Sequence, residues 1–353
     1  METTKHLLEI YNIYIKEIST IIIKMEPTKI AAINMAPALA QGQNIVFSPL
    51  SLIYVLALLS ASAQGPAKDE LNNVFNLQGY DPAANKNFHL AANIFMRNLN
   101  LLKSNDAMAA FKIDPQPLLS AEQVNKWVSD NTAGMIPKIL EKIGDEEVIL
   151  VSALYFSGKF QNAFDPRQTV AADFSSFNGK TPCQMMYAKR HMGYARTSTA
   201  QVVELEYADS DIVARLILPL EDGQAAFEHS LSEENLDAKL RSKEIELRLP
   251  QFEIQSTFEL KQILQKVDVN QMFESIDCRE SLGSQLRVSS VIQKSVITVD
   301  EFGTDAASVT IISMRGSSLV QEKVLEVSFN KPFWFILQDG QDLIFSAGIQ
   351  TTK

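Results

Sequence analysis

The chain has 353 residues, of which 46% are hydrophobic, and its formal net charge at pH 7 is −10. This composition is typical of a globular protein with a large core, and the negative balance excludes the broad basic surface that nucleic-acid binding requires. The length allows two domains, although single folds of this size exist. The two cysteines, Cys183 and Cys278, are far apart in the sequence. We therefore expect two reduced thiols, with neither a disulfide framework nor a zinc site.

The N-terminal stretch 7–23 is rich in isoleucine and tyrosine, but three charged residues interrupt it. A signal-peptide core is an uninterrupted apolar run, and a membrane span needs about twenty apolar residues. The spacing instead predicts an amphipathic helix, and Met25 offers a second start site. We expect residues 1–27 to form an N-terminal extension of a cytoplasmic protein with no membrane partner. Release without a signal peptide stays open.

The first half of the chain is mainly helical in pattern. The Asn44–Ser51 stretch, NIVFSPLS, leads into an apolar helix that runs through Leu59, with Ser48 as its N-cap and Pro49 in its first turn. Val148–Phe156 is an apolar run of strand length, which predicts a central strand buried on both faces. Further predicted elements are helices over 29–40, 65–77 and 121–140 and a strand over 88–96.

Strands dominate the second half. The pattern predicts strands over 202–207, 212–219 and 293–301 and a helix over 260–273. Helices followed by a region rich in strands indicate an α+β fold with long antiparallel or mixed sheets.

The stretch Val299–Leu319 reads VDEFGTDAASVTIISMRGSSL. Alternate side chains of a strand point to opposite faces, and after Gly303 one set is uniformly small: Thr304, Ala306, Ser308 and Thr310. The other set, Asp305, Ala307, Val309 and Ile311, would face solvent or a covering layer. The pattern predicts a strand that can insert between others after a glycine hinge. A flexible loop accounts for the composition equally well.

Several motifs carry a resemblance to a known family. VDEFGTDAASVT resembles the hinge of the serpins, V-N/D-E-x-G-T-E-A-A-A-A-T, and Phe329–Phe335, FNKPFWF, resembles their C-terminal signature. NIVFSPLS is similar to their N-I-F-x-S-P-x-S motif. The resemblance covers the chain from about Thr28 to its end. It implies one serpin domain over 28–353 with three β-sheets, eight to nine helices and an exposed reactive-centre loop over about 303–324.

The resemblance also implies an activity. A serpin is a suicide substrate: a target protease cuts the loop, and the loop then inserts into the main sheet and traps the protease as a covalent complex. The hinge residues implied here are Glu301, Gly303, Thr304, Asp305, Ala306, Ala307, Ser308 and Thr310. Because the inward positions are small, we expect an inhibitor that acts as a monomer on a serine protease. The alternative is a non-inhibitory serpin with a binding, storage or chaperone-like role.

The family's spacing from Gly303 places the cut bond at Ser317–Ser318. Since the length downstream varies, Met314, Arg315 and Leu319 are alternatives. A small residue at the cut favours an elastase-like target, and Met314 or Leu319 a chymotrypsin-like target of the cathepsin G type. Arg315 would favour a trypsin-like target, and cysteine proteases stay open.

The resemblance places Ser48 and Ser51 in the "shutter" beneath the large sheet, where strands must part. Three residues depart from the family there and nearby: Ser152 replaces an asparagine, Gln293 a histidine and Phe160 a tryptophan. Ser152 and Gln293 can still form hydrogen bonds. Either Ser152 and Gln293 form a polar contact that replaces the one between asparagine and histidine in the family, or the two replacements are independent of each other.

Nothing in the sequence indicates catalysis. The four histidines lie in no recognisable motif, and no G-x-S-x-G, H-E-x-x-H or phosphate-binding loop occurs. We therefore expect a protein that is not an enzyme and that needs neither cofactor nor metal. Residues 76–110 hold only three basic residues, so we expect no heparin site.

Overall fold

The structure is a computed structural model that describes residues 25–80, 89–98, 114–280, 284–304 and 324–352. The helices in these ranges are α2 (Pro27–Leu39), α3 (Pro49–Ser62), α4 (Pro66–Phe75), α6 (Ala121–Asn131), α7 (Gln224–Ser230), α8 (Glu233–Leu236), α9 (Lys261–Lys266) and α10 (Gln271–Glu274), with a 3-10 turn, η3, at Pro166–Gln168.

The strands are β1 (Ile45–Phe47), β2 (His89–Met96), β3 (Gln116–Pro117), β4 (Val148–Tyr155), β5 (Gly158–Lys159), β6 (Val170–Ser176), β7 (Gly179–Arg196), β8 (Ala200–Glu206), β9 (Ile212–Pro219), β10 (Arg241–Pro250), β11 (Phe252–Glu259), β12 (Ile276–Cys278), β13 (Ser284–Leu286), β14 (Ser290–Val299), β15 (Gly303–Thr304), β16 (Leu325–Ser328), β17 (Phe333–Asp339) and β18 (Asp342–Ile349).

These strands form three sheets, which confirms the predicted α+β architecture; the described residues contain eight α-helices. A nine-stranded sheet has the order β1-β18-β17-β9-β8-β7-β10-β16, with β6 paired to β7. A seven-stranded sheet has the order β3-β2-β4-β14-β15-β5, with β11 paired to β14, and β12 and β13 form a small third sheet.

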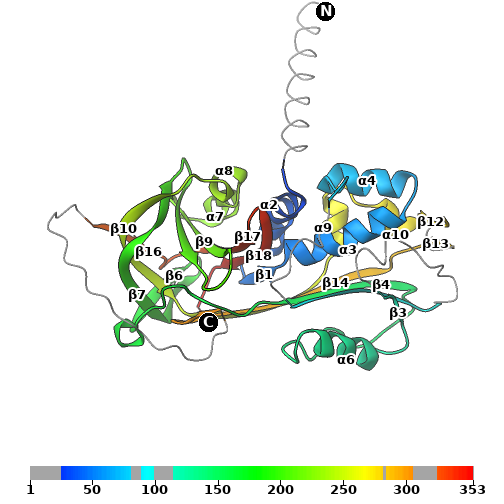
Figure 1. Cartoon of the computed structure of the whole chain (residues 1–353), viewed down its shortest axis with the longest axis horizontal. Coiled ribbons are helices and arrows are strands. Elements are labelled where there is room, and N and C mark those ends of the chain that lie inside the picture. The colour runs from blue at the N-terminus through cyan, green and yellow to red at the C-terminus, as the bar shows by residue number, and fades with distance from the viewer. Residues whose placement is uncertain (1–24, 81–88, 99–113, 281–283, 305–323, 353) are drawn as a thin grey trace, which may run out of the picture.

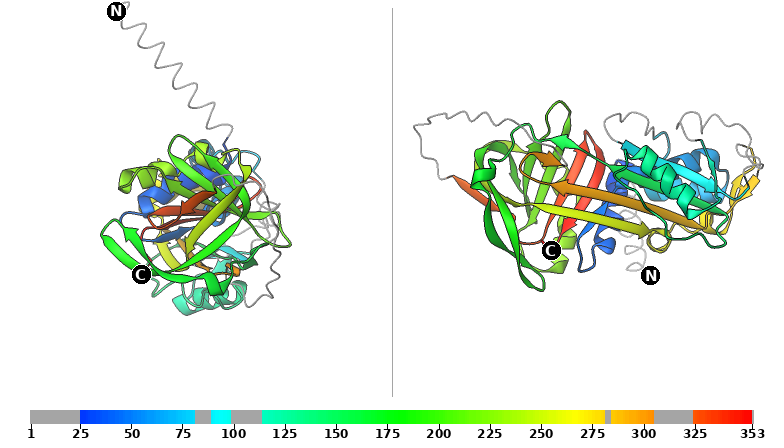
Figure 2. Two further views of the ribbon diagram at one scale, coloured as in Figure 1. Left: turned by 90° about the vertical axis from the view of Figure 1, so that its left-hand side faces the viewer. Right: turned by 90° about the horizontal axis from the view of Figure 1, so that it is seen from below.

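The seven-stranded sheet is covered on both faces. Helix α6 lies on one face, while α3 packs on the opposite face against β2 and β4 (Figure 1). The view from below shows α6 crossing the long strands (Figure 2). Because both faces are covered, every residue of β4 is buried. The prediction of a central strand over 148–156 is confirmed.

The start of α3 also follows the sequence prediction. Ser48 is the N-cap, and its hydroxyl oxygen accepts a hydrogen bond from the amide of Ser51. Pro49 occupies the first helical position, where its missing N–H leaves no bond unmade. Apolar residues all around α3 are buried because it lies between the two large sheets.

Two predicted helices are shorter than their patterns indicate. The helix predicted over 121–140 ends at Asn131, because Ala133 and Gly134 take left-handed φ values of 52° and 80°. The helix predicted over 260–273 is two short helices, α9 and α10, separated by Asp268 at φ 65°. The spacing of apolar residues does not predict a left-handed residue of this kind when that residue is not glycine.

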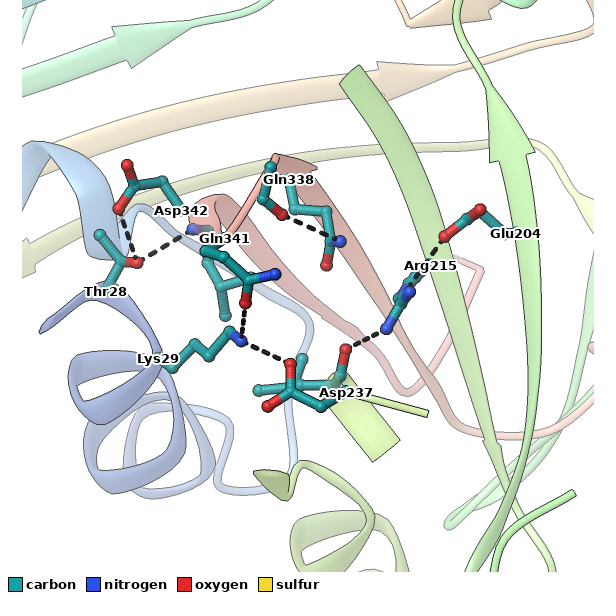
Figure 3. Close-up of polar contacts among 11 residues, drawn as sticks. Thr28, Lys29, Glu204, Arg215, Asp237, Gln338, Gln341 and Asp342 are labelled. Atoms are coloured by element: carbon teal, nitrogen blue, oxygen red, sulfur yellow. Dashed lines mark hydrogen bonds and ion pairs between the residues drawn. The ribbon is translucent and has the colours of Figure 1, made fainter. Parts of the chain in front are cut away.

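Helix α2 is fastened to the body of the protein by a buried lysine. The Lys29 Nζ atom lies 2.5 Å from Asp237 Oδ1, just after α8, and 2.5 Å from Gln341 Oε1 in the β17–β18 turn (Figure 3). One residue earlier, the Thr28 hydroxyl donates to Asp342 Oδ1 and accepts from the amide of Leu343. Among the residues that the structure describes, no helix is long and apolar enough to span a membrane.

Both cysteines are free and buried. Burial raises the pKa of Cys183, with the Asp173 carboxylate adding to the effect. Burial and, second, the charge of Asp277 raise the pKa of Cys278 to about 12. Because both pKa values are raised, both thiols are protonated at neutral pH. The thiolate is the reactive form, so both thiols react slowly.

We predict that the native protein resists alkylation by N-ethylmaleimide, with Cys278 slower than Cys183. Raising the pH from 7 to 9 should speed labelling of both thiols, with Cys278 still the slower because its pKa is about 12. Mass spectrometry of peptides after timed labelling measures both rates, and unfolding in guanidinium should equalise them. Faster labelling of Cys278 than of Cys183 in the native state would contradict the packing described.

Candidate functional site

Two parallel strands, β4 and β14, form the centre of the seven-stranded sheet. Their paired residues run from Ile149 opposite Ser290 to Tyr155 opposite Val296, and we call this pairing the seam. Beyond it the strands part, and the two-residue strand β15 lies between the end of β14 and β5. We call this place the entry. There β15 is antiparallel to both neighbours.

The turn into β15 is fixed by one side chain. Asp300 Oδ1 accepts hydrogen bonds from the amides of Phe302 and Gly303 at 2.8 and 3.2 Å. The Asp300 amide in turn donates to the carbonyl of Gly303. An aspartate that bonds amides two and three residues later is a common turn device, so the direction in which the chain leaves β14 is determined locally.

A second set of bonds ties this turn to residues 160–164, which we call the anchor segment. The amide of Phe160 donates to the carbonyl of Phe302, and the amide of Phe164 to that of Glu301, both at 2.8 Å. The Glu301 side chain is buried and accepts from the hydroxyl of Thr169 at 2.6 Å. Several hydrogen bonds therefore hold the base of the predicted hinge.

Gly303 occupies a position that only glycine fits. Its φ is +151°, and a Cβ atom there would lie 2.1 Å from the carbonyl oxygen of Gly158. L-amino acids avoid this backbone region, and the added atom would overlap the neighbouring strand. The sequence-predicted hinge glycine therefore lies where two backbones approach closely.

Thr304 is the first of the small inward residues, and the structure places it on the inner face. Its side chain is buried, with the hydroxyl 2.5 Å from the hydroxyl of Tyr207. Burial raises the pKa of Tyr207 far above its usual value, so the phenol stays protonated. The Tyr207 ring packs at 5.1 Å from the rings of Phe156 and Phe160. Phe160 is itself buried, so it fills the inner side of the entry with an aromatic ring.

The predicted shutter residues form one hydrogen-bonded network under the seam. Gln293 of β14 accepts from the amide of Ser48 at 2.9 Å and donates to the carbonyl of Ser48 at 2.8 Å and to the hydroxyl of Ser51 at 3.0 Å. The Ser51 hydroxyl reaches that of Ser152 of β4 at 3.3 Å. All four side chains are buried.

Ser152 and Gln293 belong to the same network. They are directly opposite each other in the seam, and both connect to the start of α3 through Ser51. The two departures from the family pattern together keep a polar contact between the seam and α3.

On the outer face of the seam, a hydrogen bond connects β14 to the segment that follows α6. The Lys294 Nζ atom donates to the carbonyl of Lys138 at 2.7 Å, which fastens β14 to the chain returning from α6. Burial and the nearby charge of Lys138 lower the pKa of Lys294. This return segment is bonded to α6 through Asn125, whose side-chain oxygen accepts from the amides of Ile139 and Leu140.

The remaining predicted site residues lie outside the described part of the chain. They are Asp305, Ala306, Ala307, Ser308 and Thr310 of the hinge and Met314, Arg315, Ser317, Ser318 and Leu319 of the candidate reactive bond. Within the described ranges, no group of three or more histidine, cysteine, aspartate or glutamate side chains is arranged to hold a metal ion.

Three residues of the site were missed by sequence reasoning. Tyr207 and Lys294 make contacts with residues far away in the sequence, so no local pattern indicates them. Asp300 did carry a signal, since an aspartate three residues before a glycine is typical of a turn.

Comparison with known proteins agrees with this geometry. A family model described as Serpin (serine protease inhibitor) matches residues 30–349. A serine protease inhibitor of Mus musculus is 31% identical over 88% of this chain and 81% of its own length. Serine protease inhibitor 42Dd of Drosophila melanogaster is 27% identical over 87% of this chain and 91% of its own. The crystal structure of Serpin48 from Tenebrio molitor has a TM-score of 0.81 at 20% identity, covering 93% of this chain and 97% of that one.

Replacing Gly303 by alanine should destabilise the entry. Strain at a positive φ costs about 1–3 kcal/mol, and the overlap with Gly158 forces β15 to move as well. The matched control is Gly179→Ala, because Gly179 has a φ of +122° with no atom within 4 Å of an added Cβ. Denaturant unfolding should give a larger loss for Gly303→Ala than for Gly179→Ala; equal losses would refute the close contact.

Replacing Gln293 by leucine should break the shutter network. The amide of Ser48 would lose its buried partner, which costs about 1–3 kcal/mol, whereas the carbonyl of Ser48 keeps its bonds from the Leu52 amide and the Ser51 hydroxyl. The control is Gln255→Leu on the neighbouring strand β11, since Gln255 is exposed. We expect a loss of stability of roughly 1–3 kcal/mol for Gln293→Leu and about 0.5 kcal/mol or less for the control. Similar values for the two variants would show that the network contributes little.

Proposed function

The chain belongs to the serpin family, and we propose that it inhibits a serine protease as a suicide substrate whose cut loop inserts into the seam. One observation carries the proposal: the entry already holds the first two residues of an inserted strand. These two residues are antiparallel to β14 and to β5, as a strand entering between the parallel strands β4 and β14 would be.

The pairing at the entry is in register with the seam. Thr304 is opposite Val299 of β14 and opposite Gly158 of β5. Continuing both ladders by six residues brings Thr310 opposite Gln293 on one side and opposite Ser152 on the other. Those two residues are themselves opposite each other in the seam. A strand growing from the entry therefore needs no shift of register on either side.

The inner face of the seam suits the small residues of the loop. Residues directly opposite in a sheet point to the same face, so Ser308 and Thr310 would lie beside Ser295 and Gln293. The buried hydroxyl of Ser295 has no hydrogen-bond partner among the described residues. Loop hydroxyls arriving there would give Ser295 a partner and would join the shutter network.

Insertion also improves the backbone pairing of the sheet. One parallel ladder would be replaced by two antiparallel ladders, and parallel pairing is slightly less stable per residue. The 14 steps from Gly303 to Ser317 span roughly 46 Å as a strand at 3.3 Å per residue. An attached protease would be carried over that distance, far enough to distort its active site.

The chemistry belongs to the target. The protease's serine oxygen attacks the carbonyl carbon before the cut bond, the peptide bond breaks, and its nitrogen takes up a proton. An ester then joins the two proteins, and insertion prevents its hydrolysis by water. Serine at position 317 favours an elastase-like target, and Met314 or Leu319 a chymotrypsin-like one.

The proposal is tested by incubating the protein separately with chymotrypsin, elastase, cathepsin G and trypsin. Denaturing gels should show a band at the summed mass with at least one protease, and mass spectrometry of the released C-terminal peptide should locate the cut bond. If every protease cuts the loop without forming such a band, the protein is not an inhibitor. A binding or storage role would then take its place.

A charge on the inward face should convert the inhibitor into a substrate. Thr310→Arg would bring a guanidinium against the buried pair Gln293 and Ser152, at a cost of several kcal/mol. The ester would then hydrolyse before insertion finishes. Gel densitometry should show less complex and more cleaved protein than for Asp305→Arg, which places the same charge on the opposite face. Equal complex yields from the two variants would contradict the register.

A further inference from the structure

A polar pocket of about 290 Å³ lies where β7 separates from β8, with Arg190 of β7 in its wall. Residues 193–196 of β7 pair with β8, but the pairing stops at Gly193 opposite Glu204. Farther along, the anchor segment fills part of the fork, with the amide of Gln161 bonded to the carbonyl of Glu206. The pocket is the space between these three pieces of chain and the start of β10, which contributes Ser242.

Arg190 is a half-buried cation that makes one hydrogen bond to the protein in the described ranges. Its Nη1 donates to the carbonyl of Ala163 at 3.2 Å, and its guanidinium lies 5.2 Å from the centre of the Phe164 ring. Burial alone lowers the pKa of Arg190 to about 10. No carboxylate in the described ranges forms an ion pair with it. A guanidinium has five N–H donors, so most of its hydrogen-bonding capacity is unused.

The acidic residues of the pocket wall do not supply the missing partner. Glu204 is engaged by Arg215, with Nε 3.0 Å from its Oε2, and Figure 3 shows the two side chains facing each other. Glu206 is exposed. On the other side, the exposed side chains of Asn162 and Ser242 add neutral donors to the wall.

From this arrangement we propose that the pocket binds a small oxyanion, a phosphate or a carboxylate, through the guanidinium of Arg190. Arginine suits such groups because its planar fork forms two parallel charged hydrogen bonds to them. Asn162, which also lines the pocket, offers an amide N–H as a further donor. The bound anion would restore the charge balance that burial denies to Arg190.

The site is joined to the hinge through the anchor segment. Ala163, which receives the bond from Arg190, lies between Phe160 and Phe164, whose amides hold the carbonyls of Phe302 and Glu301. An anion that fixes Arg190 therefore stabilises the base of the hinge. The binding itself does not depend on protease inhibition, so it can be tested without a protease.

The test is calorimetric titration of the whole protein with inorganic phosphate and, separately, with acetate, each against sodium chloride of equal ionic strength. We expect saturable binding of at least one anion, and the two arms distinguish phosphate from carboxylate as the preferred group. Arg190→Met keeps the aliphatic stem on Phe164 and should weaken binding roughly ten- to hundredfold. Arg241→Met, which removes an exposed charge from β10, should bind as the parent protein does.

A second variant keeps the test valid if Arg190→Met does not fold. Asn162 is exposed, so Asn162→Ala should fold normally and bind the anion several-fold more weakly. Absence of saturable binding of either anion would overturn the proposal. Equal affinity in the parent protein and in both pocket variants would also overturn it, by showing that the anion binds elsewhere.

Discussion

The structure depends on a pair of parallel strands that separate at one end. Over the seam, β4 and β14 satisfy each other's backbone groups. Where they part, two strand edges would be left without partners, and buried backbone groups without partners are costly. Residues Gly303 and Thr304 supply the partners. The beginning of the loop is thus required by the sheet, and the same requirement defines the path that the rest of the loop can follow.

The two sides of the seam are held unequally. Gln293 makes three hydrogen bonds to the start of α3, whereas Ser152 is joined to the same network by a single 3.3 Å contact. If the strands part, β14 can stay bonded to α3 while β4 gives up one weak bond. On the outer face, the bond from Lys294 to the return segment of α6 also belongs to β14. The inner network therefore favours movement of β4 away from a fixed β14, whereas the Lys294 bond must break if α6 moves together with β4.

Local patterns were sufficient where one residue type has one physical role. The buried strand β4, the Ser48 cap and the glycine at 303 were all predicted, because burial on two faces, capping and positive φ each select particular residues. Patterns failed where the deciding contact is distant or the conformation unusual. Ala133 ends α6 in a left-handed conformation that alanine rarely adopts. The Tyr207–Thr304 bond joins residues 97 positions apart, and only the fold reveals that Ser152 is opposite Gln293.

The central claim is that the cut loop inserts between β4 and β14, which pair with each other in the intact protein. The most direct measurement is the unfolding temperature of the intact and of the cut protein, determined by scanning calorimetry. The loop is cut with a protease that does not form the covalent complex. Two new antiparallel ladders and a newly paired Ser295 should raise the unfolding temperature by about 10 °C or more, equivalent to several kcal/mol. An unfolding temperature that stays the same within about 2 °C, with the cut verified by mass spectrometry, would contradict insertion.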